Sequence, residues 1–300
     1  MELRIMIDAG RGADYDAELT LAQAAESLGF SGYFRSDHHL PRGGRAAVPT
    51  DAWTTLAGLA RETTTIRLGT LVSDATFRPP ALLAVQVAQV DRMSGGRVEL
   101  GIGPGGDPRE HRAFGTTLPE DRDARFEEQL GILHALWQRP AGSAHSAAGR
   151  YFELVDFPVP STVQHQIPVI LSGLDSPRAT VLTADFAHEF NAPPMSTAAA
   201  RAQIEEVRRF ADYRPDLVYS VTVDACVGTT GSDVARRAAA AGDDLTRLTE
   251  TGVVGTPAQV VEALGHYAEA GATRVYLRLG DASDLDHLEL IASAVAPQLP

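Results

Sequence analysis

Short apolar runs alternate along this chain with segments whose apolar residues recur at helical spacing. Each apolar run predicts a buried strand, and the periodic segment after it predicts a helix. Eight strands are predicted in this way, at residues 3–7, 31–35, 65–72, 97–102, 167–171, 187–191, 217–227 and 273–279. Eight strand-then-helix units favour an α/β fold closed as a (β/α)8 TIM barrel over an open, doubly wound sheet.

One segment interrupts this succession after the fourth unit. Residues 139–166 combine prolines and glycines with a short aromatic run at Tyr151 and Phe152. We interpret them as an insertion, a hairpin near the barrel mouth. Because α/β barrels of about this length are routinely single domains, residues 1–300 are predicted to form one TIM-barrel domain.

Composition and charge exclude several classes of protein. The net charge of −13, with no basic run, argues against a nucleic-acid partner. The single cysteine, Cys226, lies in an apolar run, so we expect a packed side chain and neither a disulfide nor a Cys-based metal site. No apolar run approaches 18 residues and the N-terminus lacks signal-peptide character, so no membrane span is expected and a cytoplasmic protein is predicted.

In a TIM barrel the functional groups lie at the C-terminal ends of the strands. The densest titratable cluster at a predicted strand end is Asp37, His38 and His39. These residues suit acid–base chemistry, the orientation of a cofactor, or metal binding. Metal binding is the least favoured, because adjacent histidines on a strand point in opposite directions and no further ligand motif is nearby.

The loop after the fourth strand reads Gly103, Pro104, Gly105, Gly106, and glycines allow a backbone to approach a ligand closely. A structural turn explains the loop equally well, and it matches neither a Rossmann fingerprint nor a P-loop. His111, shortly after this loop, could reach a phosphate or a ring, or could belong to a solvated helix start.

A second candidate loop is Ser172, Gly173 and Leu174, which precedes a helix. Free N–H groups at a helix N-terminus favour an anion such as a phosphodiester, although plain capping is the alternative. Arg11, Arg35 and Arg78 also lie near the predicted mouth, where any one of them could pair with an anionic tail.

Sequence motifs of a known family occur along nearly the whole chain, in the same order as in that family. The chain resembles the luciferase-like monooxygenase superfamily, in particular the branch of coenzyme F420-dependent oxidoreductases. The matching words include FRSDHHL at residues 34–40, RLGTLVS at 67–73, DRMSGGRVELGIGPG at 91–105, EHRAFG at 110–115 and VVGTPAQVVEALGHYAEAGATRVYL at 253–277.

The resemblance implies a flavin-like ring lying over the strand ends. It implies a non-proline cis peptide at Leu71–Val72, with Ser73 next, supporting the ring from behind. By the same resemblance Asp37 contacts the deazaflavin and His38 faces the ring or exchanges a proton. The segments 103–106 and 172–174 match those that hold the side of the ring and the phosphate tail.

The chain also departs from its relatives. They usually read G-A-G-W where this chain has Gly103-Pro104-Gly105-Gly106, and G-G-S-G at residues 172–175. The loss of a large aromatic side chain predicts an altered substrate space.

The leading hypothesis is an oxidoreductase that transfers a hydride from reduced coenzyme F420 to a small organic substrate, reducing a C=C or C=N bond, with His38 or His39 as proton donor. An FMN-dependent monooxygenase of the same superfamily is the alternative, and a binding protein without catalysis is a third reading. The resemblance also implies a homodimer.

Overall fold

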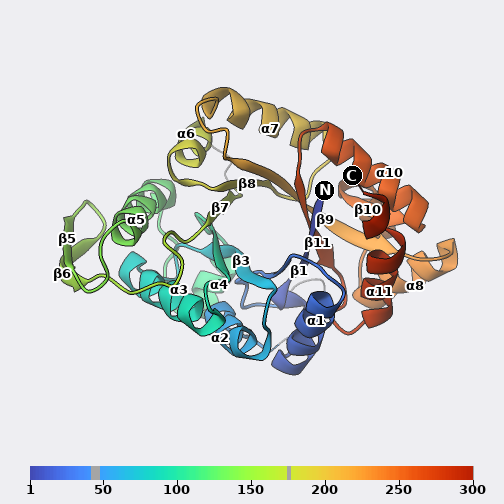
Figure 1. Cartoon of the computed structure of the whole chain (residues 1–300), viewed down its shortest axis with the longest axis horizontal. Coiled ribbons are helices and arrows are strands. Elements are labelled where there is room, and N and C mark those ends of the chain that lie inside the picture. Colours follow the sequence, from blue (N-terminus) through green and yellow to red (C-terminus); the bar gives the residue numbers. More distant parts are fainter. Residues whose placement is uncertain (42–47, 174–176, 300) are drawn as a thin grey trace.

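The computed structural model describes residues 1–41, 48–173 and 177–299, and within them eight parallel strands close into a barrel (Figure 1). Pairing of the last barrel strand with the first and of the sixth with the seventh completes the ring. The predicted TIM barrel is therefore confirmed. In order around the barrel the strands are β1 (Glu2–Ile7), β2 (Gly32–Arg35), β3 (Arg67–Asp74), β4 (Val98–Gly103), β7 (Val169–Ser172), β8 (Glu189–Ala192), β9 (Val218–Val227) and β11 (Arg274–Leu279).

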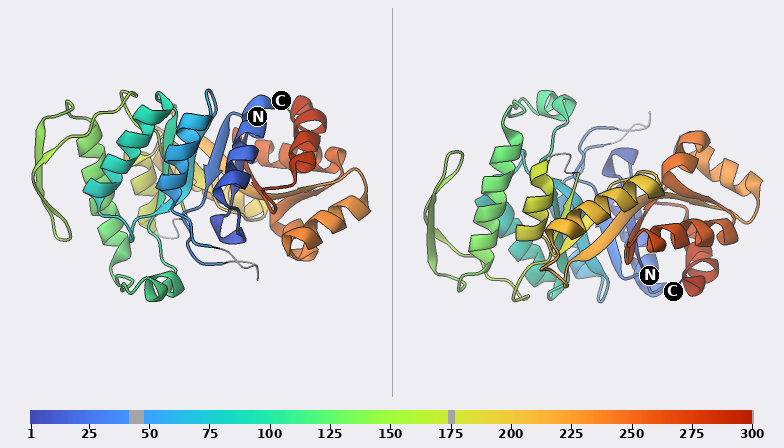
Figure 2. Two further views of the ribbon diagram at one scale, coloured as in Figure 1. Left: turned by 90° about the horizontal axis from the view of Figure 1, so that it is seen from below. Right: turned by 90° about the horizontal axis from the view of Figure 1, so that it is seen from above.

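Helices surround this barrel, and the two termini lie close together in all three views (Figures 1 and 2). The sequence marks several helix starts, because the side chains of Asp14 and Asp51 accept hydrogen bonds from the first turns of α1 and α2. The helices are α1 (Tyr15–Ser27), α2 (Ala52–Glu62), α3 (Pro80–Ser94), α4 (Pro108–Ala113), α5 (Arg122–Trp137), α6 (Pro177–Phe186), α7 (Thr197–Phe210), α8 (Gly231–Ala241), α9 (Leu245–Thr251), α10 (Pro257–Glu269) and α11 (Leu285–Ala294), with 3₁₀ turns at Ala9–Arg11 and Ala296–Gln298.

The region after β9 differs from the prediction. The single helix expected there is two helices, because Gly242 adopts a left-handed conformation (φ 69°) that ends α8. An unpredicted strand, β10 (Gly252–Gly255), pairs with residues 224–227 of β9, whereas β8 pairs with residues 218–221. The long strand β9 therefore pairs with β8 and β11 in the barrel and carries β10 as a ninth strand of the same sheet at its end.

The insertion forms an antiparallel hairpin of β5 (Ala144–Ala148) and β6 (Glu153–Pro158). The carboxylate of Glu128 on α5 accepts hydrogen bonds from the backbone N–H groups of Arg150, Tyr151 and Phe152, at 2.8–3.2 Å. The hairpin lies along the outer side of α5 (Figures 1 and 2), and it supplies none of the described residues of the cleft at the strand ends.

The barrel interior has three layers. At the N-terminal end of the strands lies a buried ionic network that includes Arg4, Glu99, Glu189 and Arg274. Above it, a small apolar cluster fills the centre, and above that the interior opens into a cleft. The apolar cluster consists of Met6, Phe34, Leu71, Ile170 and Tyr276. Because this cluster fills the centre, the barrel is a packed core and only its upper end can receive a ligand.

Candidate active site

A cleft of about 680 Å³ lies at the C-terminal ends of the barrel strands. Each of the eight strands, or the loop that follows it, contributes to its wall, and the volume is that of a small-molecule site. Its lining includes Met6, Asp8, Ser36, Asp37, His38, Leu71, Val72, Asp74, Gly105, Gly106, Asp107, Arg122, Ser172, Gly173, Asn191, Thr222 and Arg278.

The floor of the cleft is built by the end of β3. The peptide bond between Leu71 and Val72 is cis, which confirms the expectation, and the pairing register of β3 with β4 shifts between Thr70 and Ser73. Gly103 permits this arrangement, since a Cβ there would lie 2.9 Å from Val72 Cγ2. Leu71 and Val72 therefore present an apolar surface to the cleft.

Ser73 lies behind this floor and not in the cleft. Its hydroxyl accepts a hydrogen bond from Trp53 Nε1 at 2.9 Å and donates one to Thr70 Oγ1 at 3.2 Å. Ser73 is fully buried. We infer that it supports the floor from below and does not touch a ligand.

Asp37 lines the cleft but is held by an ion pair. Both of its carboxylate oxygens accept from Arg78, which also bonds Asp51. Asp37 is only 3% exposed. Burial raises the pKa of Asp37, and the attraction of Arg78 offsets this only in part. Its carboxylate is thus a fixed wall of the site, with its bonding capacity largely used.

His38 lines the cleft with a side chain that is 33% exposed, and its Nδ1 lies 3.5 Å from Glu110 Oε1. The same oxygen accepts the backbone N–H groups of His39 and Leu40 at 2.9 and 3.1 Å. Burial opposes ionisation of Glu110, but His38 and these two amides outweigh it and lower the pKa of Glu110 to about 2. A fixed anion therefore faces one nitrogen of the cleft histidine.

The other two predicted histidines do not line the cleft. His39 packs against the rings of Phe77 and Phe114, with centroids 5.6 and 5.0 Å away. His111 is 2% exposed, stacks on Phe77 at 4.5 Å, and has a threonine hydroxyl within 3 Å of each ring nitrogen. Both histidines stabilise the packing of the loops around the cleft.

Of the glycine loop, Gly105 and Gly106 line the cleft, whereas Gly103 ends β4 and Pro104 faces a smaller neighbouring hollow. Gly105 has φ 72°, and a Cβ there would collide with the carboxylate of Asp74. Only glycine suits both the backbone and this contact. In the second loop Ser172 and Gly173 line the cleft, and Leu174 lies outside the described residues.

The three arginines considered as anion partners are all engaged elsewhere. Arg11 bonds Asp243 at 2.8 Å, Arg35 lies 3.1 Å from Glu18, and Arg78 holds Asp37. Their positions in the sequence did not distinguish a structural ion pair from a ligand contact.

Sequence reasoning named the right strand ends but missed several lining residues, among them Asn191, Thr222 and Arg278. The missed signal was the alternation of the strands. Glu189 and Ser220 face the barrel interior, so the residues two positions further on must face it as well, one layer nearer the mouth. Arg278 is bonded to Asp224 at 2.6 and 2.8 Å.

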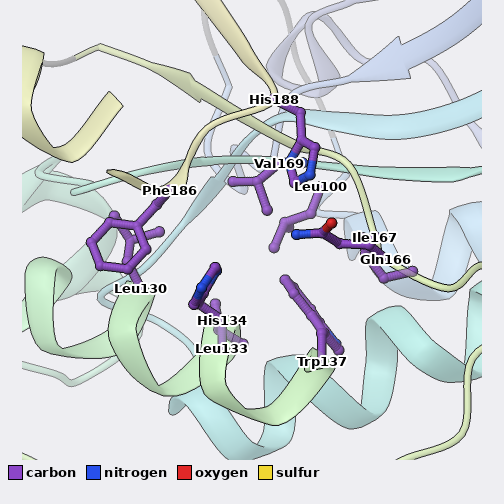
Figure 3. A pocket seen from close by; sticks show the side chains of 10 residues that line it. All are labelled: Leu100, Leu130, Leu133, His134, Trp137, Gln166, Ile167, Val169, Phe186 and His188. Atoms are coloured by element: carbon purple, nitrogen blue, oxygen red, sulfur yellow. Dashed lines mark hydrogen bonds between the residues drawn. The ribbon is translucent and has the colours of Figure 1, made fainter. Parts of the chain in front are cut away.

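A second hollow lies between α5 and the barrel wall (Figure 3). It receives the side chains of His134 and Trp137 from α5 and of His188, the residue just before β8. Its volume is only about 10 Å³, the space of one water, so it cannot hold an organic ligand. Among the described residues no group of three or more His, Cys, Asp or Glu side chains could hold a metal ion.

Comparison with known proteins agrees with this geometry. Residues 2–244 match the family model of the luciferase-like monooxygenases. The chain belongs to this family. Relatives from several bacteria are named F420-dependent glucose-6-phosphate dehydrogenase. That of Amycolatopsis mediterranei is 33% identical over 157 residues, 50% of this chain and 45% of its own, and that of Microbacterium testaceum is 32% identical over 174 residues, 55% and 49%. The chain thus spans about half the length of these curated relatives.

Solved structures share the fold over the whole chain. An F420-dependent secondary alcohol dehydrogenase in complex with an F420–acetone adduct superposes with a TM-score of 0.87 at 16% identity, covering 100% of this chain and 99% of its own. The oxygenating constituent of 3,6-diketocamphane monooxygenase from Pseudomonas putida, in complex with FMN, gives 0.77 at 18% identity, with coverage of 100% and 99%. At these identities the likeness establishes the fold.

The side chains that line the cleft of this family member suit the chemistry of a flat ring with a polar edge. Met6, Leu71 and Val72 offer an apolar face, and Asn191 and Thr222 offer amide and hydroxyl groups beside it. Glycines at 105 and 173 leave backbone accessible at two sides. No helix of the described residues is long and apolar enough to cross a membrane.

Proposed function

We propose that this chain is a coenzyme F420-dependent oxidoreductase that transfers a hydride between the deazaflavin and a small organic substrate. One observation carries the proposal: the apolar floor at Leu71–Val72 lies in the same cleft as His38, whose Nδ1 faces the buried Glu110. A ring placed on this floor has a proton-exchanging group in the same cavity. The F420-dependent names of the sequence relatives support the choice of cofactor.

Each part of the cleft has a separate task in this proposal. The deazaflavin, when bound, supplies the hydride at its C5. Leu71 and Val72 support one face of the ring, and the backbone at Gly105 and Gly106 borders it. Ser172 and Gly173 lie before α6, whose N-terminal end favours the anionic tail.

His38 exchanges the proton that accompanies the hydride. The carboxylate of Glu110 holds Nδ1 as a donor, so proton exchange with substrate takes place at Nε2. For reduction of a C=C or C=N bond, the finer proposal from the sequence, the hydride adds to one atom of the double bond and the proton from His38 to the other. The same histidine can accept a proton in the reverse direction.

The second candidate is an FMN-dependent monooxygenase. It is supported by the shared fold of the FMN-bound diketocamphane monooxygenase. The two candidates differ in cofactor, and both place a tricyclic ring on the same floor.

Titration of the purified protein separates them. Oxidised F420, reduced F420 and FMN are each added, and binding is followed by fluorescence and calorimetry. We expect F420 to bind in the micromolar range or tighter and to be turned over with an enone or imine from a substrate screen. Tight FMN binding without F420 binding would reverse the ranking, and binding of neither would refute both candidates. The homodimer stays a prediction, tested by light scattering.

A further inference from the structure

Asn191 is a buried amide with a defined orientation at the end of β8. It is 1% exposed, and it lines the cleft. Three hydroxyl groups on neighbouring strands hold it. Ser172 and Thr222 donate to Oδ1 at 3.1 and 3.0 Å, and Nδ2 donates to Ser220 Oγ at 2.9 Å.

The network determines which end of the amide is nitrogen. Ser220 gives its single hydroxyl proton to the backbone carbonyl of Phe190 at 3.2 Å, so towards Asn191 it can only accept. Nδ2 must therefore face Ser220. The carbonyl oxygen receives two hydroxyl protons, one for each lone pair. A flip of the amide would place Oδ1 against the accepting oxygen of Ser220 and lose that bond, although the hydroxyl groups of Ser172 and Thr222 could still accept from Nδ2.

This arrangement uses every bonding position of the amide except one. Nδ2 has two hydrogens and makes one hydrogen bond among the described residues. A buried N–H without an acceptor is rare in folded proteins. Because Asn191 lines the cleft, the missing acceptor is to be sought in a ligand there.

We propose that Asn191 is a ligand-binding residue that donates this remaining hydrogen to the edge of a ring held in the cleft. The apolar floor of Met6, Leu71 and Val72 suits the face of a flat ring, while a fixed amide suits an acceptor in its plane. A heterocycle with a carbonyl edge meets both conditions. The inference rests on the proposed function, in which that ring is the pyrimidinedione of the deazaflavin.

A purely structural role predicts different behaviour. If Asn191 served only to connect β7, β8 and β9, it would need its three hydrogen bonds to Ser172, Thr222 and Ser220 but not the second hydrogen of Nδ2. The two roles are separated by Asn191→Asp, in which the carboxylate still accepts from Ser172 and Thr222 but cannot donate to a ligand. Ser220→Ala is the matched control, because it removes a bond of the same amide on the side that does not line the cleft.

We measure the F420 dissociation constant by fluorescence and the thermal midpoint for both variants. Asn191→Asp should weaken F420 binding about tenfold or more, because a donor is replaced by a negative acceptor. Ser220→Ala should lower the thermal midpoint and change the dissociation constant less than threefold. F420 binding by a folded Asn191→Asp within twofold of the wild type would overturn the proposal.

NMR of the wild-type protein tests the contact without any variant. In ¹⁵N-labelled protein, one of the two side-chain amide protons of Asn191 should shift downfield on saturation with F420, while the proton bonded to Ser220 should stay in place. If neither proton moves although F420 binds, the inference fails and the proposed function stands. If only FMN binds, the same shift is sought with FMN, whose ring has the same carbonyl edge. If neither cofactor binds, the proposed function and the assignment of the ring fall together.

Discussion

The two ends of the barrel interior both carry polar side chains, but these side chains differ in what they bond. At the lower end Arg4 bonds Glu99, with Nη2 and Oε1 3.0 Å apart, and Arg274 bonds Glu189. At the upper end Asn191 retains a hydrogen that has no acceptor in the described part of the chain, and the side chain of His38 is one-third exposed in the cleft. The lower polar groups bond mainly one another, and an oxygen left over, Glu189 Oε1, is buried where no ligand can enter, whereas the upper polar groups face the open cleft.

The same strands supply both ends. Strand β8 carries Glu189 in the lower layer and Asn191 in the upper, and β1 carries Arg4 below and Met6 above. A polar residue facing the inside of a barrel is thus no sign of function by itself. What distinguishes the functional end is that its polar groups lie beside an apolar surface in an open cleft of about 680 Å³, whereas the oxygen of Glu189 that lacks a partner among the described residues is buried in the lower layer.

Removing an ion pair from the lower end should have the largest effect on the free energy of unfolding. Glu99→Leu removes the carboxylate that bonds both Nη atoms of the buried Arg4 and leaves Glu2 as its ion-pair partner among the described residues. The free energy of unfolding should therefore fall by about 3 kcal/mol, the lower end of the range for a broken buried ion pair. Urea unfolding measures it. The double variant Arg4→Met with Glu99→Leu should recover much of the loss, and a double variant as unstable as the single would show that the charge is not the cause.

A substitution of His38 at the upper end should lower turnover and leave the free energy of unfolding nearly unchanged. His38→Ala should reduce turnover by about 10²- to 10⁴-fold, the usual contribution of a positioned acid or base, with F420 affinity within a few-fold of the wild type. Single-turnover kinetics with the substrate from the screen measure the loss. His39→Ala is the control, since His39 does not line the cleft. Equal losses in the two variants would contradict the assignment of the proton to His38.

His287 is a buried histidine outside the cleft and can be compared with His38. His287 is buried and accepts the N–H of Val227 at 2.9 Å. Burial, aided by Arg237, lowers its pKa from 6.5 to about 4. Between pH 6.5 and 4 the unfolded chain binds a proton that the folded chain does not. Its contribution to stability, roughly 3 kcal/mol in all, is therefore complete above pH 6.5 and is lost as the pH falls through 4.

His287→Gln should flatten this part of the stability curve. Urea unfolding at pH 7.5 and 4.5 compares the variant with the wild type. An unchanged slope would show that His287 does not titrate as its burial predicts.

A substitution of Gly105, at the rim of the cleft, is expected to have the smallest effect on stability and on F420 binding. Gly105→Ala imposes a side chain at φ 72° and against Asp74, and should cost about 1–2 kcal/mol of stability and raise the F420 dissociation constant several-fold. Gly142→Ala is the matched control, with φ 78° and open space around the added Cβ. Equal effects of the two on F420 binding would show that Gly105 does not border the ring.

The sequence predicted the barrel well because periodicity is a local property. Each strand lies within a few residues of its expected range, and the insertion was found where the period failed. The strand β10 was missed because its four residues pair only with the outer end of β9, and that pairing leaves no pattern of its own.

The site was harder to predict, because hydrogen-bonding capacity is a property of partners distant in the chain. Asp37 and His38 lie side by side in the sequence, but Arg78 engages one and Glu110 faces the other. His111 carries the right chemistry, yet Thr76 and Thr116 bond both of its nitrogens. The cis peptide at Leu71–Val72 was expected only through the family resemblance.

A crystal structure of the protein soaked with F420 tests the central claim most directly. We expect the deazaflavin ring on the floor formed by Leu71 and Val72, with its carbonyl edge within hydrogen-bonding distance of Asn191 Nδ2 and with His38 beside the position of the substrate. A ring bound outside this cleft, or one whose carbonyl edge faces away from Asn191, would contradict it.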